Sequence, residues 1–492
     1  MRRKCDNRVC EAEAQLSRVV LVNTNRMRPP IAPIGLDYIA DSLRAEGVEV
    51  ELLDLCFAES AEETISSALR EQAPGLVALT LRNTDDCFLA SGEDFVPEFA
   101  HIVRLAREQT GAPLVIGGIG YSLFAEAILE ATGADYGIVG DGEVALARLV
   151  QALGGEDRVE EVPGLVWREG GMVRRNPPWT GALEELPARR RDFVDNGRYF
   201  VEGGQAGVET KRGCDRGCIY CADPVGKGRR VRTRTPAQVA DEFAALLNQG
   251  IDHIHLCDSE FNVVPEHAIA VCEELKRRGL EKRTSWYTYA TPAGFTGGLA
   301  QAMREAGCVG VNFGADSGDD EMLAGLGRDF RLHDLWETAT ACREAGLIFM
   351  YDLLLGGPGE TRESVARTVE VMKAISPDRV GVSLGVRVYP GTGLSGIVRG
   401  AGPMAENPNL RGAVVGNDGF LSPVFHLSAE LGEDAAGYVG GLVGGDQRFF
   451  FPTTEAGTEA YNYNDNKRLV EAIRAGYRGA YWDVLRRVAA ER

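Results

Sequence analysis

The chain has 492 residues, of which 44% are hydrophobic and 25% are charged, a composition typical of a globular protein with about three domains. No apolar run approaches the ~20 residues that a membrane-spanning helix needs, and the first residues lack the apolar stretch of a signal peptide. We therefore expect a cytoplasmic protein that does not associate with membranes. Its 53 basic and 72 acidic residues give a net charge of −19, which disfavours nucleic acid as a partner because like charges repel.

Eleven cysteines are too few for a disulfide framework in a chain of this length, and without an export signal we expect their thiols to stay reduced. Three of them, Cys214, Cys218 and Cys221, are tightly grouped and are the candidate metal ligands. The other eight are scattered, and most lie in apolar patterns typical of a core: Cys5, Cys10, Cys56, Cys87, Cys257, Cys272, Cys308 and Cys342.

Short apolar runs alternate with amphipathic ones over residues 1–155. This alternation predicts five strand–helix units in series and hence an α/β domain with a parallel, doubly wound (Rossmann-like) sheet. Ligands of such sheets lie beyond the carboxyl ends of the strands, where glycines cluster in this sequence. The predicted strands are 18–23, 48–53, 76–81, 114–116 and 136–139, and the predicted helices include 34–46, 62–72 and 95–109.

Residues 156–205 interrupt this rhythm and are interpreted as a linker. A hairpin is predicted over 164–174, turning at Gly170 and Gly171, and prolines and a run of arginines at 189–191 follow it. We place the domain boundary in this segment.

A second alternating series predicts an incomplete (β/α)6 barrel over residues 206–395, with its active site at the carboxyl ends of the strands. A small, partly helical C-terminal region follows over 396–492, with one helix expected at 466–490. Its aromatic and amide residues at 461–466 and 478–482 are interpreted either as a substrate-pocket lining or as a packing cap. The predicted barrel strands are 208–212, 253–256, 285–289, 310–313, 348–354 and 379–386.

The three grouped cysteines have the spacing C-x3-C-x2-C and directly follow the first predicted barrel strand. Three thiolates hold three irons of a [4Fe–4S] cluster and leave the fourth iron open to an outside ligand. Structural zinc would need a fourth ligand, for which Cys257 and His255 are candidates, and a chance grouping of core thiols is the third alternative. Between residues 211 and 234, eight basic and two acidic side chains indicate a cationic rim that lowers thiol pKa values and suits an anionic cluster.

With Tyr220 directly before its last cysteine, this loop resembles that of the radical S-adenosylmethionine (SAM) superfamily. The resemblance covers most of residues 205–395. It implies that the open iron binds the amino and carboxylate groups of SAM, and that an electron from the cluster splits SAM into methionine and a 5′-deoxyadenosyl radical. An external donor of the flavodoxin or ferredoxin kind is then a partner.

Other barrel segments resemble SAM-contacting motifs of that superfamily. Asp258, Ser259 and Glu260 stand where a Gly-Gly-Glu-type motif holds the methionine amino group, but the glycines are absent, so the three remain alternatives. The remaining candidates by resemblance are Tyr220 in the cysteine loop, Asp316 and Ser317 near the ribose, and Gly356 and Gly357 near the adenine. Tyr287 and Tyr289 are the candidate catalytic residues; with Trp286 they are expected on the third barrel strand, and at least one of the three is expected to be core.

A doubly wound domain ahead of such a barrel resembles the cobalamin-binding radical SAM enzymes. A nucleotide-binding sheet is the rival interpretation, but no G-x-G-x-x-G follows the first strand and no phosphate loop is present. The resemblance implies cobalamin at the carboxyl ends of the strands. The candidate cobalamin-binding residues are Pro33, Gly35, Thr80, Arg82, Asn83, Gly117, Gly118, Ser122, Gly140, Gly142 and Glu143.

The D-x-H-x-x-G motif that supplies a histidine to cobalt in other cobalamin domains is absent. His101 lies inside a predicted helix and is expected to be an ordinary helix residue, so cobalt would lack a lower histidine ligand. Arg82 is the hypothesised residue beneath the corrin ring, and Thr80 and Ser122 are hypothesised to hydrogen-bond the dimethylbenzimidazole tail.

The sequence therefore predicts a cobalamin-dependent radical SAM methyltransferase that acts on a carbon of a small molecule or natural-product intermediate. The resemblance implies methyl transfer from SAM through methylcobalamin to a substrate radical, or, as in tryptophan methylation, to an sp2 carbon without that radical. A cyclisation or rearrangement without methyl transfer is the alternative within the family. A non-enzymatic cobalamin or redox sensor is the alternative outside it.

Overall fold

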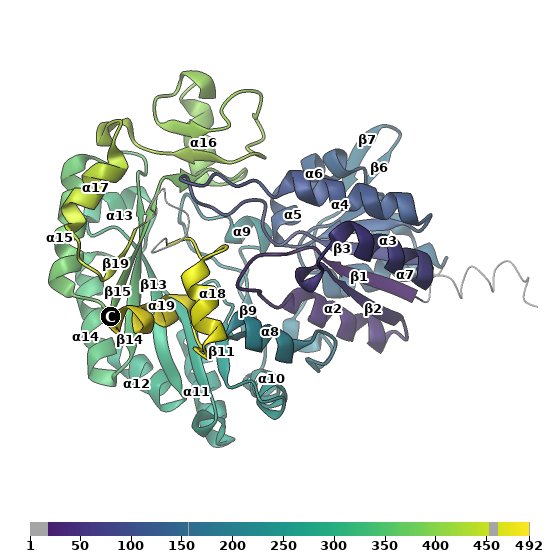
Figure 1. The fold of residues 1–492 in the computed structure, drawn as a ribbon, viewed down its shortest axis with the longest axis horizontal. Coiled ribbons are helices and arrows are strands. Elements are labelled where there is room, and N and C mark those ends of the chain that lie inside the picture. The colour runs from purple at the N-terminus through teal and green to yellow at the C-terminus, as the bar shows by residue number, and fades with distance from the viewer. Residues whose placement is uncertain (1–17, 156, 452–460, 492) are drawn as a thin grey trace, which may run out of the picture. The chain divides into compact units, whose positions relative to one another are not determined.

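The computed structural model describes residues 18–155, 157–451 and 461–491. Cys5 and Cys10 lie outside the described residues. The chain forms two compact units (Figure 1). The first unit runs to Val194, except for two short segments, Arg28–Ala32 and Asp86–Glu93, which belong with the second unit together with everything from Asp195 onward.

The first unit contains the predicted parallel sheet. Its strands have the order β2-β1-β3-β4-β5, which confirms the doubly wound arrangement. The hairpin predicted within the linker is also confirmed, but β6 and β7 continue the same sheet, antiparallel to β5. The strands are β1 (Arg18–Asn23), β2 (Glu49–Asp54), β3 (Leu76–Thr80), β4 (Leu114–Gly117), β5 (Tyr136–Ile138), β6 (Leu165–Glu169) and β7 (Met172–Arg175).

Helices cover both faces of this sheet (Figure 1), which explains why the consecutive residues 19–23 of β1 are all buried. Helices α2 (Ile34–Ala45) and α7 (Gly142–Leu153) pack together with one set of strand residues, including Val19 and Leu21. Helices of the second set contact one another in the order α3-α4-α6: α3 (Ala61–Gln72), α4 (Val96–Gln109) and α6 (Ala125–Thr132). A short helix, α5 (Ile119–Leu123), follows β4.

The arginine run that we interpreted as part of a linker is packed into the first unit. Arg189 makes an ion pair with Glu143 at 3.1 Å, and Arg191 makes one with Asp37 at 2.8 Å, with all four side chains almost completely buried. The Arg189 guanidinium also lies over the ring of Tyr38, 4.1 Å from its centroid. These contacts tie the segment to α2 and α7. Spacing along the chain did not reveal them, because the partner carboxylates are far away in sequence.

The second unit contains the predicted partial barrel. Seven parallel strands have the order β8-β11-β12-β13-β14-β15-β19. The predicted strand 208–212 was wrong in extent, because β8 ends at Val208 and β9 (Lys211–Arg212) pairs instead with β10 (Arg232–Thr233). The barrel strands are β8 (Ala206–Val208), β11 (His253–Leu256), β12 (Ser285–Ala290), β13 (Cys308–Asp316), β14 (Ile348–Leu355), β15 (Arg379–Leu384) and β19 (Phe449–Phe450).

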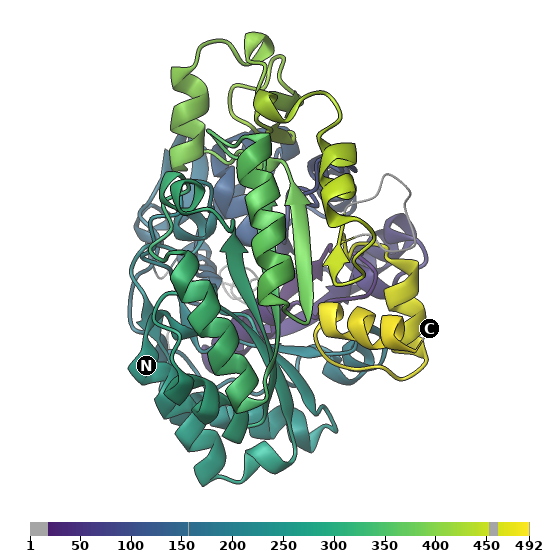
Figure 2. The same cartoon turned by 90° about the vertical axis from the view of Figure 1, so that its left-hand side faces the viewer.

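Helices lie along the outer face of these strands (Figure 2). Between strands and helices is a large apolar core that takes every second strand residue, such as Val311 and Phe313 of β13. Trp286 belongs to this core and donates its indole N–H to the carbonyl of Ala306 at 2.8 Å, so it points away from the barrel interior. The helices are α10 (Pro236–Asn248), α11 (Pro265–Arg277), α12 (Gly297–Glu305), α14 (Leu332–Ala345), α15 (Arg362–Ile375) and α17 (Ala435–Val443).

The C-terminal region differs from the sequence prediction in one respect. The single helix expected over 466–490 is two helices, α18 (Lys467–Arg474) and α19 (Tyr481–Ala490), separated at Gly476 and Gly479, whose φ values of 103° and 115° suit glycine. Both helices share an apolar cluster with Tyr287 and Met350 of the barrel. Within the described part of the chain, we find no helix with the length and apolar character to cross a membrane.

Candidate functional site

The cysteine loop leaves β9 and is held in place by backbone contacts with distant segments. The N–H of Ile219 donates to the carbonyl of Leu326 at 3.0 Å, and the N–H of Leu394 donates to the carbonyl of Ile219 at 2.7 Å. Gly213, with a φ of 90°, allows the loop to begin, because a Cβ there would collide with the carbonyl of Arg230. These contacts fix the path of the loop.

The three thiols suit an iron–sulfur cluster. None of Cys214, Cys218 and Cys221 forms a disulfide. Burial raises the pKa of all three, and that of Cys218 to about 11, so the thiols stay protonated unless metal ions compensate the charge of the thiolates. The same loop faces a buried oxygen, Oε2 of Glu260, that has no hydrogen-bond partner in the described part of the chain. An ionisable oxygen left unpaired beside one buried and two partly buried thiols indicates a site that a metal cluster and its ligand complete.

The cationic rim inferred from the sequence is wrong for most of its members, because carboxylates neutralise them. Lys211 is paired with Asp258 at 3.2 Å, Arg212 with Glu209 at 2.7 Å, and Lys227 with Asp223 at 2.9 Å. Arg216 and Arg234 have carboxylate partners as well. These ion pairs brace the loop and do not lower the thiol pKa values.

The cation beside the thiols is Arg328, which sequence reasoning missed because it lies between α13 (Asp320–Gly325) and α14, more than a hundred residues from the loop. Its Nη1 donates to Sγ of Cys218 at 2.9 Å, and its Nη2 donates to Glu260 at 3.3 Å and to the carbonyl of Gly314 at 2.8 Å. Its Nε lies 3.3 Å from Asp316. Arg328 thus links the cysteine loop to the ends of two barrel strands.

The structure separates the three candidates Asp258, Ser259 and Glu260. Asp258 is wrong as a SAM ligand, because it is fully buried and accepts hydrogen bonds from the backbone N–H groups of Thr210 and Lys211 at 2.8 and 3.2 Å in addition to its ion pair. Ser259 donates to Asp223. Glu260, with its unpaired oxygen, is the one of the three that faces the cysteine loop with spare hydrogen-bonding capacity.

Asp316 and Ser317 point to different places. Asp316 adopts a left-handed φ of 59° and accepts a hydrogen bond from the hydroxyl of Tyr220, so both side chains lie beside the cysteine loop. Ser317 is completely buried and contacts the hydroxyl of Thr368 at 3.0 Å, while its own hydroxyl accepts from the N–H of Asp319. Ser317 was therefore wrongly predicted as a ribose contact, because its hydroxyl is used to join β13 to α15.

Gly356 and Gly357 form a tight turn after β14 that an unanticipated residue stabilises. Both N–H groups donate to Oε2 of Glu360, at 2.5 and 3.3 Å, and Glu360 is completely buried. Gly356 has a φ of 98°, and a Cβ there would collide with Leu427. Burial raises the pKa of Glu360 to about 7. The role of Glu360 in holding this turn was not predicted, because a glutamate directly before a helix N-cap has no distinctive sequence signal.

The two candidate catalytic tyrosines have different surroundings. Tyr287 is buried in the apolar cluster of α18 and α19, donates its hydroxyl to Asp483 at 3.0 Å and packs edge-on to Trp482. This is a packing position, so the catalytic prediction for Tyr287 is wrong. Tyr289 lies two residues further along β12, on the same face, and is 42% exposed. Its ring centroid is 4.9 Å from that of His255.

In the first unit, the loops after β3, β4 and β5 come together at the carboxyl edge of the sheet. Gly118 and Gly120 pack directly against the backbone of Leu81 and Asn83, where a Cβ would collide. The hydroxyl of Thr24 donates to the carbonyl of Thr80 at 2.6 Å and so joins the end of β1 to the same loops. In the strand order β2-β1-β3, this edge between β1 and β3 is where doubly wound sheets bind ligands.

Some predicted cobalamin ligands have structural tasks instead. Glu143 is used in its buried ion pair with Arg189 and was wrongly predicted as a ligand. The Cβ that Gly142 lacks would collide with Ile39, so this glycine serves the packing of α7 on α2. Ser122 donates to the carbonyl of Gly118 at 2.9 Å and accepts from the N–H of Gly140 at 3.1 Å, which leaves it one remaining acceptor position.

Other predicted ligands remain open at this edge. Arg82 is half-buried and its Nη1 lies 3.6 Å from the sulfur of Met27, while Asn83 is exposed. Pro33 and Gly35 begin α2, with nothing within 4 Å of a Cβ at Gly35, and Gly117 ends β4. His101 is an exposed residue of α4 beside Glu62, as predicted.

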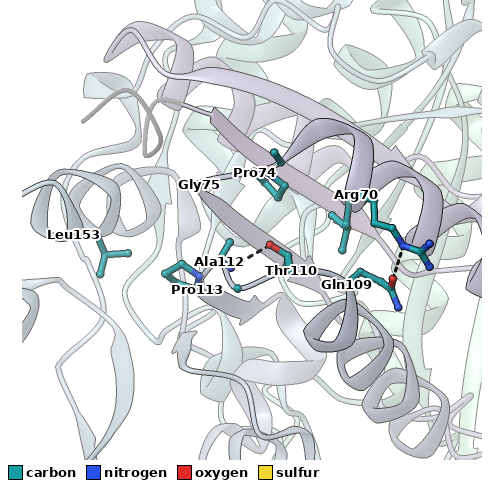
Figure 3. Close-up of a pocket in the computed structure, with 11 residues that line it drawn as sticks. Arg70, Pro74, Gly75, Gln109, Thr110, Ala112, Pro113 and Leu153 are labelled. Carbon is teal, nitrogen blue, oxygen red and sulfur yellow. Dashed lines mark hydrogen bonds between the residues drawn. The ribbon is translucent and has the colours of Figure 1, made fainter. Parts of the chain in front are cut away.

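A cavity of about 650 Å³ lies at the opposite edge of the first sheet (Figure 3). It is lined by residues around the amino ends of β3 and β4, including Pro74, Gly75 and Pro113. Arg70 donates to Gln109 at 2.8 Å across its border. Because ligands of doubly wound sheets bind at the carboxyl edge, this cavity is separate from the predicted cofactor site.

Comparison with known protein families matches both units. Residues 20–150 match the model of the B12 binding domain, and residues 208–372 match that of the radical SAM superfamily. The chain is 33% identical over 442 residues to the tryptophan 2-C-methyltransferase of Streptomyces laurentii, covering 77% of this chain and 74% of that protein.

Two solved structures are similar to this chain over almost its whole length. The radical SAM methyltransferase TsrM from Kitasatospora setae, with tryptophan and a SAM analogue bound, superposes with a TM-score of 0.88 at 31% identity over 96% of this chain and 99% of its own. A second structure of TsrM, with cobalamin and a [4Fe–4S] cluster bound, gives a TM-score of 0.87 at 30% identity, over 97% of this chain and 100% of its own.

Proposed function

The chain belongs to the cobalamin-binding radical SAM methyltransferases, and on that premise we propose that it transfers a methyl group from SAM to a ring carbon of tryptophan or of a small molecule built on an indole. The observation that carries this substrate class is the similarity to a tryptophan 2-C-methyltransferase, which covers 77% of this chain and 74% of that protein. The likeness to a structure with tryptophan bound supports it.

Cys214, Cys218 and Cys221 would hold the [4Fe–4S] cluster, and Tyr220, Glu260, Asp316 and the Gly356–Gly357 turn are the proposed SAM contacts. Thr80, Arg82, Asn83, Gly117 and Gly118 are the proposed cobalamin contacts, with Pro33, Gly35, Ser122 and Gly140 around them. When bound, cobalamin supplies a carrier for the methyl group and the cluster supplies an electron. The polypeptide positions and shields these groups.

The described residues contribute to this chemistry through rigid support and burial. Arg328 fixes Glu260, Asp316 and Cys218 relative to one another, so the proposed SAM contacts and the cluster loop keep one geometry. Glu360 holds the turn of Gly356 and Gly357. Tyr289, exposed on the inner face of the barrel, is the proposed aromatic contact of the substrate.

We also propose that the protein works in the cytoplasm, where its thiols stay reduced, and that a flavodoxin- or ferredoxin-like protein supplies its electrons. Production of 5′-deoxyadenosine distinguishes a substrate radical from methyl transfer to an sp2 carbon without one.

Anaerobically reconstituted protein incubated with tryptophan and trideuteromethyl-labelled SAM tests the proposal. We expect a labelled methyl group on the indole ring, located by mass spectrometry and NMR. A variant with Cys218 replaced by alanine should give no product while still taking up cobalamin, because its first unit is unchanged. Labelled SAM that yields a cyclised or rearranged indole without the label would contradict methyl transfer.

A further inference from the structure

The inner face of the barrel carries a polar cluster whose members are not among the proposed cofactor contacts. Strand register places Asn312 beside Tyr289, and Asp352 lies two residues beyond Met350, the partner of Asn312. Because side chains alternate along a strand, Tyr289, Asn312 and Asp352 share the face opposite the apolar core. Gly381 is the neighbour of Asp352 on β15.

Asp352 is the centre of this cluster. One carboxylate oxygen accepts a hydrogen bond from the hydroxyl of Tyr461, and the other accepts from Nδ2 of Asn312 at 2.7 Å. Any side chain at Gly381 would collide with both Asp352 and Tyr461, so glycine keeps the space that they occupy. The segment with Tyr461 is itself anchored, since Phe88 packs edge-on against Tyr461 and Asn462 donates to Asp86 at 2.8 Å.

The cluster has a negative charge without a positive partner. Among the residues that the structure describes, no lysine, arginine or histidine makes an ion pair with Asp352. His255 on the same face does not supply the charge, because burial lowers its pKa to about 4 and it is neutral at pH 7. Burial raises the pKa of Asp352 to about 6, so the carboxylate is still ionised at neutral pH.

The cluster also has acceptors without donors. Asn312 is only 3% exposed and directs its Nδ2 at a carboxylate, which can only accept, so its Oδ1 faces away and has no partner among the described residues. The hydroxyl oxygen of Tyr463 is buried and likewise has no partner in residues 18–155, 157–451 and 461–491. A buried polar atom left unpaired destabilises the protein, so such a pair of atoms indicates a missing ligand.

Aromatic rings surround these atoms. Tyr461 and Tyr463 pack with ring centroids 5.7 Å apart, and both lie within electrostatic range of Tyr289. The faces of aromatic rings attract cations. The carboxylate of Asp352 and the unpaired oxygens of Asn312 and Tyr463 together favour a group that carries a positive charge and donates several hydrogen bonds. A protonated amine meets all of these requirements, whereas a carboxylate, a phosphate or a neutral ring carbon meets none.

We propose that Asn312, Asp352 and Tyr463 form the subsite that binds a protonated amine of the methyl-accepting substrate. The ammonium donates to Oδ1 of Asn312 and to the hydroxyl oxygen of Tyr463, and its charge balances Asp352. This inference rests on the proposed function and narrows it to substrates that carry a free amine. The two interpretations of the C-terminal aromatic residues then apply to different segments. Residues 461–463 line the substrate subsite, and residues 478–482 form a packing cap.

Binding to reconstituted protein with SAM tests this subsite without requiring turnover. The probes are tryptamine, tryptophan, phenethylamine and agmatine, each compared by calorimetry with an analogue in which a hydrogen or a hydroxyl replaces the amine. The variants are Asp352→Asn, Asn312→Ala and, as a matched charge control, Asp418→Asn at an exposed position of the same unit. We expect the wild-type protein to prefer the amine within each pair that binds, and Asp352→Asn to weaken amine binding by about tenfold or more.

Three outcomes overturn the subsite: wild-type protein that binds none of the four amines, wild-type protein that prefers the analogues, or unchanged amine binding in Asp352→Asn. Transfer of labelled methyl from SAM to cobalamin in the same samples separates this result from the proposed function. Loss of amine binding with methyl transfer to cobalamin intact supports the subsite. Failure of methyl transfer to cobalamin in the wild-type protein contradicts the proposed function. The binding measurement still decides whether the cluster of Asn312, Asp352 and Tyr463 binds an amine.

Discussion

The guanidinium of Arg328 donates a hydrogen bond of 2.9 Å to the sulfur of Cys218, although 110 residues separate them in sequence. Positive charge and hydrogen bonds at the cysteine sulfurs stabilise the reduced state of an iron–sulfur cluster, which carries one more negative charge than the oxidised state. We therefore expect Arg328→Gln to lower the reduction potential of the cluster on the order of tens of millivolts. An anaerobic redox titration followed by EPR measures it.

Arg328→Lys is the control for this prediction, because it keeps the charge and loses the planar fork that also contacts Glu260 and Asp316. Its potential should lie between those of the wild type and Arg328→Gln. Equal potentials in all three proteins, with equal iron content, would show that Arg328 does not act on the cluster.

The buried ion pair of Asp258 and Lys211 supports the cysteine loop. Both side chains are almost completely buried, so removing one leaves the other charge without a partner, at a cost of about 3–5 kcal/mol. We expect Asp258→Leu to lower the denaturation midpoint strongly and to reduce iron retention. The double variant with Lys211→Met should be more stable than Asp258→Leu alone, because it removes the unpaired charge. A double variant at least as unstable as the single one would contradict this explanation.

Glu360 gives the protein a definite pH dependence of stability. Its pKa rises from 4.5 to about 7 on folding, so the folded protein binds a proton more tightly than the unfolded chain. Stability from this group is fully present below pH 4.5 and is lost as the pH rises through about 7. Its total is about 3 kcal/mol, since one pKa unit corresponds to ~1.4 kcal/mol.

Glu360→Gln keeps an acceptor for the N–H groups of Gly356 and Gly357 and removes the titration. We expect the free energy of unfolding of the wild type, relative to this variant, to fall between pH about 5 and about 8. Denaturant titrations at a series of pH values measure this difference. A difference that stays constant or rises with pH would rule out a raised pKa at Glu360.

Arg82 provides a test of the proposed cobalamin site. It is half-buried at the end of β3, whereas its neighbour Asn83 is exposed. If Arg82 lies beneath the corrin ring, Arg82→Ala should retain cobalamin but change the EPR spectrum of its Co(II) state, because the surroundings of the lower cobalt face change. Arg104→Ala, at an exposed position of α4 in the same unit, is the matched control and should leave the spectrum unchanged. Identical spectra for Arg82→Ala and the wild type would reject this position for Arg82.

Patterns along the chain predicted both sheets and the cysteine loop because these features depend on local periodicity and spacing. Strands buried on both faces are continuous apolar runs, and the three cysteines lie within eight residues. The break between α18 and α19 was missed, although Gly476 and Gly479 marked it, because the apolar periodicity resumes on the far side.

Side-chain partnerships between distant segments could not be predicted in the same way. Glu143 and Asp258 have the residue types of ligands and stand at strand ends, but Arg189 and Lys211 occupy their carboxylates. Arg328 and Asp352 have no local signature at all. Their importance follows from the thiol and the unpaired acceptors that the fold brings beside them.

A single-turnover experiment without substrate shows whether both units serve one methyl transfer. Protein loaded with cluster and cobalamin, reduced anaerobically and mixed with trideuteromethyl-labelled SAM, should transfer the labelled methyl group to cobalamin, and adding an amine-bearing indole should then move the label to that compound. Fully loaded protein in which the label never reaches cobalamin would contradict the account.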